Sequence, residues 1–394
     1  MQAKRVALSI IITLGLIALL EGCGGEANTT LPQAPTTSVP DAVQAIQPII
    51  VSTSSSSTLP AVLSPATATV AVTSAPTPTR PPAQTATAVP ATATLAPIAT
   101  STKSAPLLPR YIEALRNRTY NGGDIKLDKL YSRTEAYTAN LIYYQSDGLK
   151  ISGLMFVPNG PAGKKYPVAL INHGYFNPTP ADYDSGWDTL RELIYFARNG
   201  YITIASDYRN YARSDKGDNE REPGYVVDIL NLIEAVKKFP QADPNQLTIM
   251  GHSMGGEITL TAMVVSPDIK VAGLFGTMSP DTVDNYNARL VWQGGKSARW
   301  VETYGTPQDN PQAYRQMSPL TYFKDVKVPT IIHIGNNDTT TPPAWSVKTR
   351  DALVAAGKKA ELYTYPGQGH SLNSPAFEQA MQRTLSFFNA GLGR

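Results

Sequence analysis

Short apolar runs of strand length alternate with helical stretches over the last three quarters of the chain. The apolar runs include residues 168–171, 201–205, 247–250 and 330–335, and residues 226–238 between the second and third runs have the pattern of a helix. Strands that alternate with helices usually pair in parallel, because each helix crosses back over the sheet before the next strand begins. The pattern therefore predicts an α/β fold with a mostly parallel central sheet and helices on both faces.

A different pattern opens this region. Residues 139–144 and 150–157 are two strand-like runs separated by Ser146-Asp147-Gly148, which is typical of a tight turn. Two strands joined in this way pair antiparallel. We therefore expect an N-terminal antiparallel hairpin at the edge of the sheet.

The segment from residue 26 to about residue 106 is dominated by Thr, Ala, Pro, Ser and Val. It holds too few large apolar side chains to offset the entropy that is lost when a chain becomes ordered. This composition predicts an extended, disordered spacer. The folded domain is then expected over residues 107–394.

The first residues resemble an export signal. Two basic residues precede an apolar run, residues 6–20, which is short for a membrane-spanning helix and typical of a secretory signal peptide. Leu20-Glu21-Gly22-Cys23 resembles a bacterial lipobox, in which the cysteine is acylated after cleavage before it, although Glu21 replaces the usual small residue.

These features predict a signal peptide over residues 1–22 and a lipid anchor on Cys23, with residues 23–106 as the spacer behind it. The protein would then be an exported lipoprotein at the bacterial cell surface. The alternative is a plain signal peptide followed by an incidental cysteine. Because Cys23 is the only cysteine in the chain, no internal disulfide can form.

Gly251-His252-Ser253-Met254-Gly255 lies between the apolar run 247–250 and a helix-compatible stretch, residues 257–265. A Gly-x-Ser-x-Gly sequence in this setting is typical of a nucleophile elbow, a turn so sharp that the serine backbone is strained and its Oγ is exposed. The glycines keep Cβ atoms out of the crowded strand and helix. Ser253 is the candidate nucleophile, and the alternative is an ordinary turn rich in glycine and serine.

A serine nucleophile needs a base, and the chain has four histidines. His370 follows a strand-like run, residues 361–365, in a glycine-rich loop before the C-terminal helix. Its position after both serine and acid matches the Ser, Asp, His order of the α/β-hydrolases and makes it the candidate base. His252 lies inside the elbow and is expected to pack, and His333 is expected to be a strand residue with satisfied hydrogen bonds.

The candidate acid is Asp338, which follows the strand-like run 330–335. A carboxylate there would hold the imidazole of His370 in the tautomer that accepts the serine proton. The alternative role for this stretch is an Asx turn before a proline pair, which Asn336 or Asn337 could also form. Asp325 is the nearest competing acid, but it precedes the strand.

The fourth histidine belongs to an apolar strand that ends in His173-Gly174-Tyr175. In this fold the loop after such a strand donates a backbone N–H to the developing oxyanion, and the residue after the nucleophile donates another. The amides of Tyr175 and Met254 are therefore the predicted oxyanion hole. The imidazole of His173 is expected to orient the loop.

From about residue 137 onward the chain resembles the catalytic domain of the prolyl oligopeptidase family of serine peptidases and, more broadly, the α/β-hydrolase fold. The resemblance rests on the elbow, the acid and the base together with four shorter matches. These are the loop 207–214, the run Asp243-Pro244-Asn245, the run Ser318-Pro319-Leu320, and Asp338 followed by Pro342-Pro343. The loop 207–214 is similar to the family's Asp-Tyr-Arg-Gly-x-Gly-x-Ser, but Asn210 and Ala212 replace its two glycines.

Residues 280–316 leave the regular alternation and carry scattered aromatic side chains, namely Tyr286, Trp292, Trp300 and Tyr304. The segment is predicted either to form a small cap over the substrate pocket or to be a surface excursion whose aromatic side chains pack on the core.

Several other functions are not supported. The net charge of +3 and the lack of a basic stripe give no reason to expect a nucleic-acid partner, no metal motif is present, and Gly294-Gly295-Lys296 lacks the context of a phosphate loop. No cofactor is expected. The non-enzyme alternatives are an adhesive surface lipoprotein and a solute-binding module.

The expected reaction is acyl transfer to water through an acyl-enzyme, on a small ester or peptide substrate. Peptide-cutting members of the family commonly carry a β-propeller, and residues 26–106 lack the repeat period of propeller blades. Esterase-like activity is therefore favoured, with exopeptidase activity as the alternative.

Overall fold

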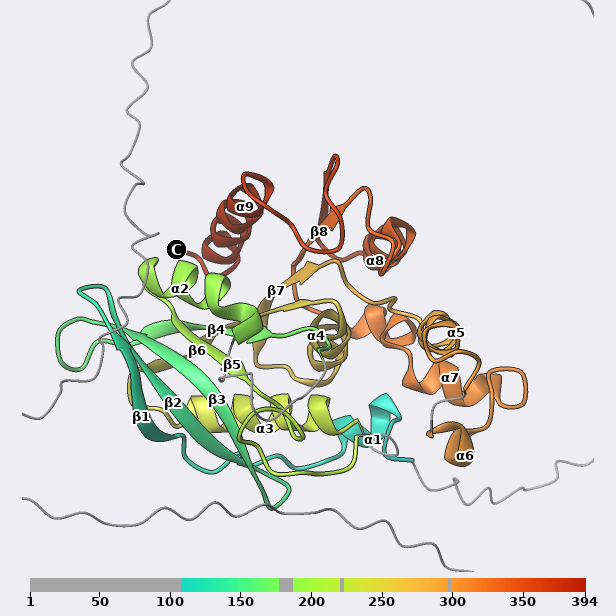
Figure 1. Ribbon diagram of the computed structural model, residues 1–394, viewed down its shortest axis with the longest axis horizontal. Helices are drawn as coiled ribbons and strands as arrows, with labels where there is room; N and C mark the ends of the chain where they lie inside the picture. Colours follow the sequence, from blue (N-terminus) through green and yellow to red (C-terminus); the bar gives the residue numbers. More distant parts are fainter. Residues whose placement is uncertain (1–107, 177–186, 220–222, 297–298) are drawn as a thin grey trace, which may run out of the picture. The chain divides into compact units, whose positions relative to one another are not determined.

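Residues 108–176, 187–219, 223–296 and 299–394 are described by the computed structural model of the chain (Figure 1). The predicted signal peptide, Cys23 and the spacer lie outside these residues.

The described residues form one nine-stranded sheet in the order β1-β2-β3-β5-β4-β6-β7-β8-β9. Its strands are β1 (Lys126–Arg133), β2 (Tyr137–Ser146), β3 (Leu149–Pro158), β4 (Tyr166–Asn172), β5 (Ile202–Ser206), β6 (Ala242–His252), β7 (Ile269–Phe275), β8 (Thr330–Gly335) and β9 (Ala360–Tyr365). The pairs from β5 through β9 are parallel, and those that involve β1, β2 and β3 are antiparallel. The predicted mostly parallel sheet with an antiparallel opening is confirmed.

Helices cover both faces of this sheet. The helices of the described residues are α1 (Ile112–Arg116), α2 (Leu190–Arg198), α3 (Gly224–Lys237), α4 (Met254–Val265), α5 (Thr282–Trp292), α6 (Val301–Tyr304), α7 (Pro311–Met317), α8 (Pro343–Ala355) and α9 (Ala376–Gly391), with 3-10 turns at Trp187–Thr189 and Pro319–Asp325. Helices α1, α3 and α4 pack on one face, and α2 and α9 lie together on the other (Figure 1). None of the helices within the described residues is long and apolar enough to cross a membrane.

The predicted hairpin is present as β2 and β3, but it does not form the edge of the sheet. Strand β1 pairs antiparallel with β2 on its outer side and is the edge strand. Most of its side chains are exposed, including Leu127 at 52% and Leu130 at 50%. Because β1 lacks the apolar and polar alternation of a half-buried strand, the sequence pattern did not reveal it.

The order of the strands brings the candidate site residues to one edge of the sheet. Strand β6 lies between β4 and β7, and β8 and β9 follow in parallel. The carboxyl ends of parallel strands meet at the same edge, where α/β proteins bind their ligands. The loops after β4, β6, β8 and β9 hold Gly174, Ser253, Asp338 and His370, respectively.

The segment that was predicted as a cap forms helices α5, α6 and α7. Most of its aromatic side chains build a small apolar cluster, in which Trp300, Tyr304 and Tyr314 are almost fully buried, whereas Trp292 is 50% exposed and lines a cleft. Leu108 and Tyr111, at the start of the described chain, pack against this cluster. A gating role for the segment stays a prediction.

Candidate active site

Ser253 lies on a strained turn between β6 and α4. Its backbone has φ 55° and ψ −118°, a conformation that residues other than glycine rarely adopt. The residue is the N-cap of α4, so its side chain lies at the positive end of that helix. Strain of this kind is typical of the nucleophile elbow and costs energy that the surrounding structure must offset.

The glycines on either side of Ser253 are required by close backbone contacts. A Cβ atom at Gly251 would lie 2.1 Å from the carbonyl oxygen of Gly255, and one at Gly255 would lie 2.1 Å from the carbonyl oxygen of Asn172. Both distances are shorter than any real Cβ contact, and in both the obstructing atom is backbone. The sequence argument that the elbow needs glycine at these two positions therefore has a direct steric cause.

Asp338 and His370 are in contact, although 32 residues separate them in the sequence. Oδ2 of Asp338 lies 2.9 Å from Nδ1 of His370, so the imidazole donates from Nδ1 and presents Nε2 as an acceptor. The Asp338 side chain is fully buried, whereas that of His370 is 25% exposed. This arrangement fixes the tautomer that a general base for Ser253 needs.

Three further hydrogen bonds hold the Asp338 carboxylate. The backbone amides of Thr340 and Thr341 donate to Oδ1 at 2.9 and 2.8 Å, and the hydroxyl of Thr341 lies 2.6 Å from Oδ2. Burial alone would raise the pKa of Asp338, but the hydrogen bonds from His370 and Thr341 outweigh it and lower this pKa below its usual range. The carboxylate is therefore ionised at neutral pH.

These contacts also decide between the alternatives for the acid. Asp338 forms the Asx turn itself, through the amide of Thr340, and contacts His370 at the same time. Asp325 instead pairs with Arg116 at 3.1 Å and has a side chain that is 41% exposed. The sequence patterns did not predict a role for Thr341. The run of threonines directly after Asp338 is the feature that could have indicated it, because their amides and hydroxyls lie within reach of the carboxylate.

Ser253 and His370 line the same cleft, which has a volume of about 810 Å³. Within the described part of the chain, no hydrogen bond joins the Ser253 hydroxyl to His370; such bonds are often long until substrate binds. The cleft wall is mixed: Met254, Ile258, Met278, Trp292 and Met317 give it apolar surface, and Arg110, Glu257 and Arg289 give it charged groups. A cleft of this size and lining fits a small ligand that carries both apolar and polar groups.

The two predicted oxyanion donors, Tyr175 and Met254, both line this cleft. Met254 is the first residue of α4, where a backbone N–H has no acceptor within the helix. Neither amide donates a hydrogen bond to another of the described residues. Tyr175 is 70% exposed. Its backbone amide can therefore serve as an oxyanion donor while its ring stays in solvent.

The ring of His173 is buried behind this loop and does not reach the cleft. Its Nδ1 lies 2.7 Å from the carbonyl oxygen of Gly174, and its ring stacks on Tyr208 at 4.2 Å between centroids. Burial lowers the pKa of His173, which keeps the ring neutral. These contacts fit the expected role of orienting the loop.

The loop after β5 keeps a glycine-like backbone without the glycines of the family pattern. Asn210 has φ 74° and Ala212 has φ 44°, both in the left-handed region that glycine favours. Asparagine tolerates this region, and here the Asn210 side chain bridges the loop through the carbonyl oxygen and the amide of Gly217. The two replacements thus leave the turns of the loop in place.

The remaining histidines have different surroundings. His333 is fully buried, and its nitrogens lie 2.8 Å from the Tyr365 hydroxyl and 3.0 Å from the Thr384 hydroxyl, as a satisfied strand histidine should. Burial and the nearby Arg383 lower its pKa to about 3. His252, expected only to pack, instead makes a hydrogen bond to the backbone of His370.

Comparisons with known proteins identify the family of the chain. The model of the prolyl oligopeptidase family matches residues 187–394. An acylamino-acid-releasing enzyme of Arabidopsis thaliana is 23% identical over 221 residues, which are 53% of this chain and 28% of that protein. An isoprenylcysteine alpha-carbonyl methylesterase of the same plant is 26% identical over 234 residues, which are 55% of this chain and 53% of that protein.

A solved structure gives the same result for the fold. The acetyl xylan esterase from Paenibacillus sp. R4 matches with a TM-score of 0.53 and 20% identity, covering 70% of this chain and 92% of that one. At this identity the likeness concerns the fold alone. The chain spans about a quarter to a half of the length of the two curated relatives above, and their names include both a peptide-directed and an ester-directed activity.

Proposed function

Because the chain belongs to the prolyl oligopeptidase family of serine hydrolases, we propose that it hydrolyses carboxylic esters through an acyl-enzyme on Ser253. The observation that carries the proposal is the strained Ser253 at the start of α4, in one cleft with an imidazole that Asp338 holds at 2.9 Å. The peptidase and esterase names among the relatives are consistent with acyl transfer in general.

The proposed reaction has two matching halves. Oγ of Ser253 attacks the substrate carbonyl carbon while Nε2 of His370 takes the hydroxyl proton, and the oxyanion accepts hydrogen bonds from the amides of Tyr175 and Met254. The bond to the leaving group breaks as His370 returns the proton to it. Water then attacks the acyl-enzyme, again with His370 as base, and releases the acid and free Ser253. Asp338 stabilises the imidazolium in both halves.

Esters are favoured over peptide amides by the chemistry of the leaving group. An alcohol or phenol departs more readily than an amine, which must be protonated by His370 before the bond breaks. The apolar side chains of the cleft, among them Met254 and Met278, suit an acyl group or an aryl ring. An exopeptidase activity is the second candidate, and it is supported by the acylamino-acid-releasing enzyme among the relatives.

A comparison of matched substrates tests this ranking. We expect short-acyl p-nitrophenyl esters to be hydrolysed with a kcat/KM well above that of aminoacyl p-nitroanilides, because both release similar aromatic groups but only the anilide needs its nitrogen protonated. The measurement is the ratio of the two kcat/KM values on the full chain. Anilide turnover as fast as ester turnover would reverse the ranking and favour the exopeptidase.

We also propose that the protein is exported and anchored by a lipid on Cys23. The support is the apolar run of residues 6–20 followed by Leu20-Glu21-Gly22-Cys23. The composition of the following segment, poor in large apolar residues, suits a spacer between membrane and enzyme.

Substitution of the cysteine tests the anchor. We expect the wild-type protein, expressed in a bacterium, to partition into the detergent phase, and Cys23→Ser to move into the aqueous phase, because the acyl chains supply the membrane affinity. Glu21→Ala, which restores a small residue before the cleavage site, is the control and should partition like the wild type or more strongly into detergent. Equal solubility of wild type and Cys23→Ser would leave only an ordinary secretory signal.

A further inference from the structure

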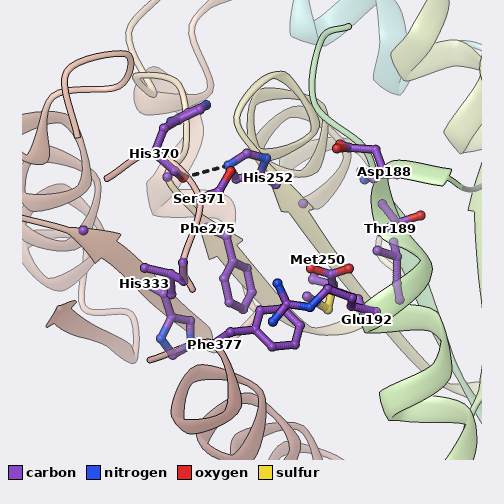
Figure 2. Close-up of a pocket in the computed structure, with 17 residues that line it drawn as sticks. Asp188, Thr189, Glu192, Met250, His252, Phe275, His333, His370, Ser371 and Phe377 are labelled. Atoms are coloured by element: carbon purple, nitrogen blue, oxygen red, sulfur yellow. Dashed lines mark hydrogen bonds between the residues drawn. The ribbon is translucent and has the colours of Figure 1, made fainter. Parts of the chain in front are cut away.

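His252 precedes the candidate nucleophile and makes a direct contact with the candidate base. Its Nε2 lies 2.9 Å from the backbone carbonyl oxygen of His370, a hydrogen bond drawn as a dashed line in Figure 2. The two imidazole rings also touch, with their centroids 4.5 Å apart and their planes inclined at 43°. A residue of the elbow is thus bonded to a loop that lies 118 positions later in the chain.

The same ring lies against the loop that holds a predicted oxyanion donor. A Cβ atom built at Gly174 would be 3.3 Å from Nδ1 of His252 and 3.3 Å from Cβ of Ser253. Gly174 directly precedes Tyr175, whose amide is one of the two predicted donors. His252 therefore has the His370 loop and the Gly174 loop as neighbours, and it is covalently joined to Ser253.

The hydrogen bond to the His370 carbonyl oxygen defines which nitrogen of the His252 ring carries a proton. A carbonyl oxygen can only accept, so Nε2 of His252 carries the proton and donates it. Burial lowers the pKa of His252, and the neighbouring His370 imidazole lowers it further, which keeps His252 neutral. A neutral ring suits this place because His370 must itself become positively charged during acyl transfer, and a second cation at this distance would oppose that.

We propose that His252 is a positioning residue. Its hydrogen bond holds the main chain of His370 in place relative to Ser253 and the Gly174 loop. This inference rests on the proposed function. The side chain of His370 is oriented by Asp338 from one side, and His252 fixes the backbone from which that side chain extends. Small displacements of a base from its nucleophile are costly, since an error of about 1 Å can reduce the rate about 100-fold.

Three substitutions separate the hydrogen bond from the packing of the ring. His252→Gln keeps an amide nitrogen near the place of Nε2 and can still donate to the His370 carbonyl. His252→Asn has its amide group near the place of Nδ1 and cannot reach that carbonyl. His252→Phe keeps a ring of similar size without any donor. Each variant is measured as the full chain for kcat and KM on a p-nitrophenyl ester, for the rate of fluorophosphonate labelling, and for melting temperature.

We expect kcat and the labelling rate to fall about 10- to 100-fold in His252→Asn and His252→Phe, with KM changed by less than about 3-fold, because the base is displaced while the cleft is unchanged. His252→Gln should stay within about 3-fold of the wild type in kcat, KM and labelling rate. All variants should keep a melting temperature close to that of the wild type, since the effect is on alignment and not on folding.

Two results would overturn the positioning role. In one, His252→Asn and His252→Phe keep the kcat of the wild type. In the other, all three variants lose kcat equally and in proportion to a loss of folded protein. Failure of the proposed function has a different signature, because the wild type would then show neither ester turnover nor labelling that depends on Ser253.

Discussion

Replacement of Ser253 by alanine is expected to abolish ester turnover, with a fall in kcat of about 10⁶-fold, as when other serine hydrolases lose their nucleophile. The reason is that no acyl-enzyme can form without Oγ. Substrate binding in the cleft and the backbone amides of the oxyanion hole would then supply only weak residual catalysis. The measurement is kcat on a p-nitrophenyl ester, together with covalent labelling by a fluorophosphonate and identification of the labelled peptide. The wild type should be labelled on Ser253 and the alanine variant should not.

Folding is the control for this experiment. Alanine at position 253 should fold normally, because removing the hydroxyl leaves the glycine contacts of the elbow in place. Ser132→Ala, in the edge strand β1 and outside the cleft lining, should be labelled and active like the wild type. Stoichiometric labelling of the Ser253→Ala protein would place the nucleophile elsewhere.

Asp338→Asn should reduce kcat about 10⁴-fold while leaving the fold intact. The asparagine oxygen can still accept from the amides of Thr340 and Thr341, so the turn is kept. Its amide group, however, would then face Nδ1 of His370 with a donor, which favours the tautomer that carries its proton on Nε2. A ring protonated on Nε2 cannot take the proton of Ser253.

The competing acid provides the matched control. Asp325→Asn removes a carboxylate that pairs with Arg116 and should keep near-full activity. Near-full activity of Asp338→Asn, or a large loss in Asp325→Asn, would assign the acid role to another residue.

The pH dependence of stability gives a second check, because folding lowers the pKa of Asp338.

A carboxylate with a lowered pKa stabilises the fold above its unfolded pKa, and this contribution is lost as the pH falls through the lower folded value. At neutral pH the wild type should therefore melt above Asp338→Asn by a margin that shrinks on acidification below about pH 4, the range of the unfolded carboxyl. A margin that is the same at neutral and acidic pH would show that the charge of Asp338 does not contribute to stability.

The sequence by itself determined the features that depend on neighbouring residues. The alternation of strands and helices predicted the fold class, which is confirmed. The elbow was visible because a strained serine needs glycine two positions before and after it, and those positions show the required close contacts. The order of Ser253, Asp338 and His370 along the chain could be interpreted because parallel strands bring their carboxyl ends together.

Other features were decided by contacts between residues far apart in the sequence. Strand β1 lacks an alternating pattern, and its pairing with the edge of β2 cannot be inferred from its own residues. The left-handed backbone of Asn210 and Ala212 could not be inferred from the sequence, and that of Asn210 is held by hydrogen bonds to Gly217.

The role of His252 shows the difference most clearly. Its place in the elbow predicted only packing, because a local pattern gives no information about which distant group a side chain will meet. Only the tertiary structure brings the carbonyl of His370 and the backbone of Gly174 to the two sides of its ring. Hydrogen bonds are short and directional, so the partner of a buried donor is decided by the packing of the whole sheet and its loops.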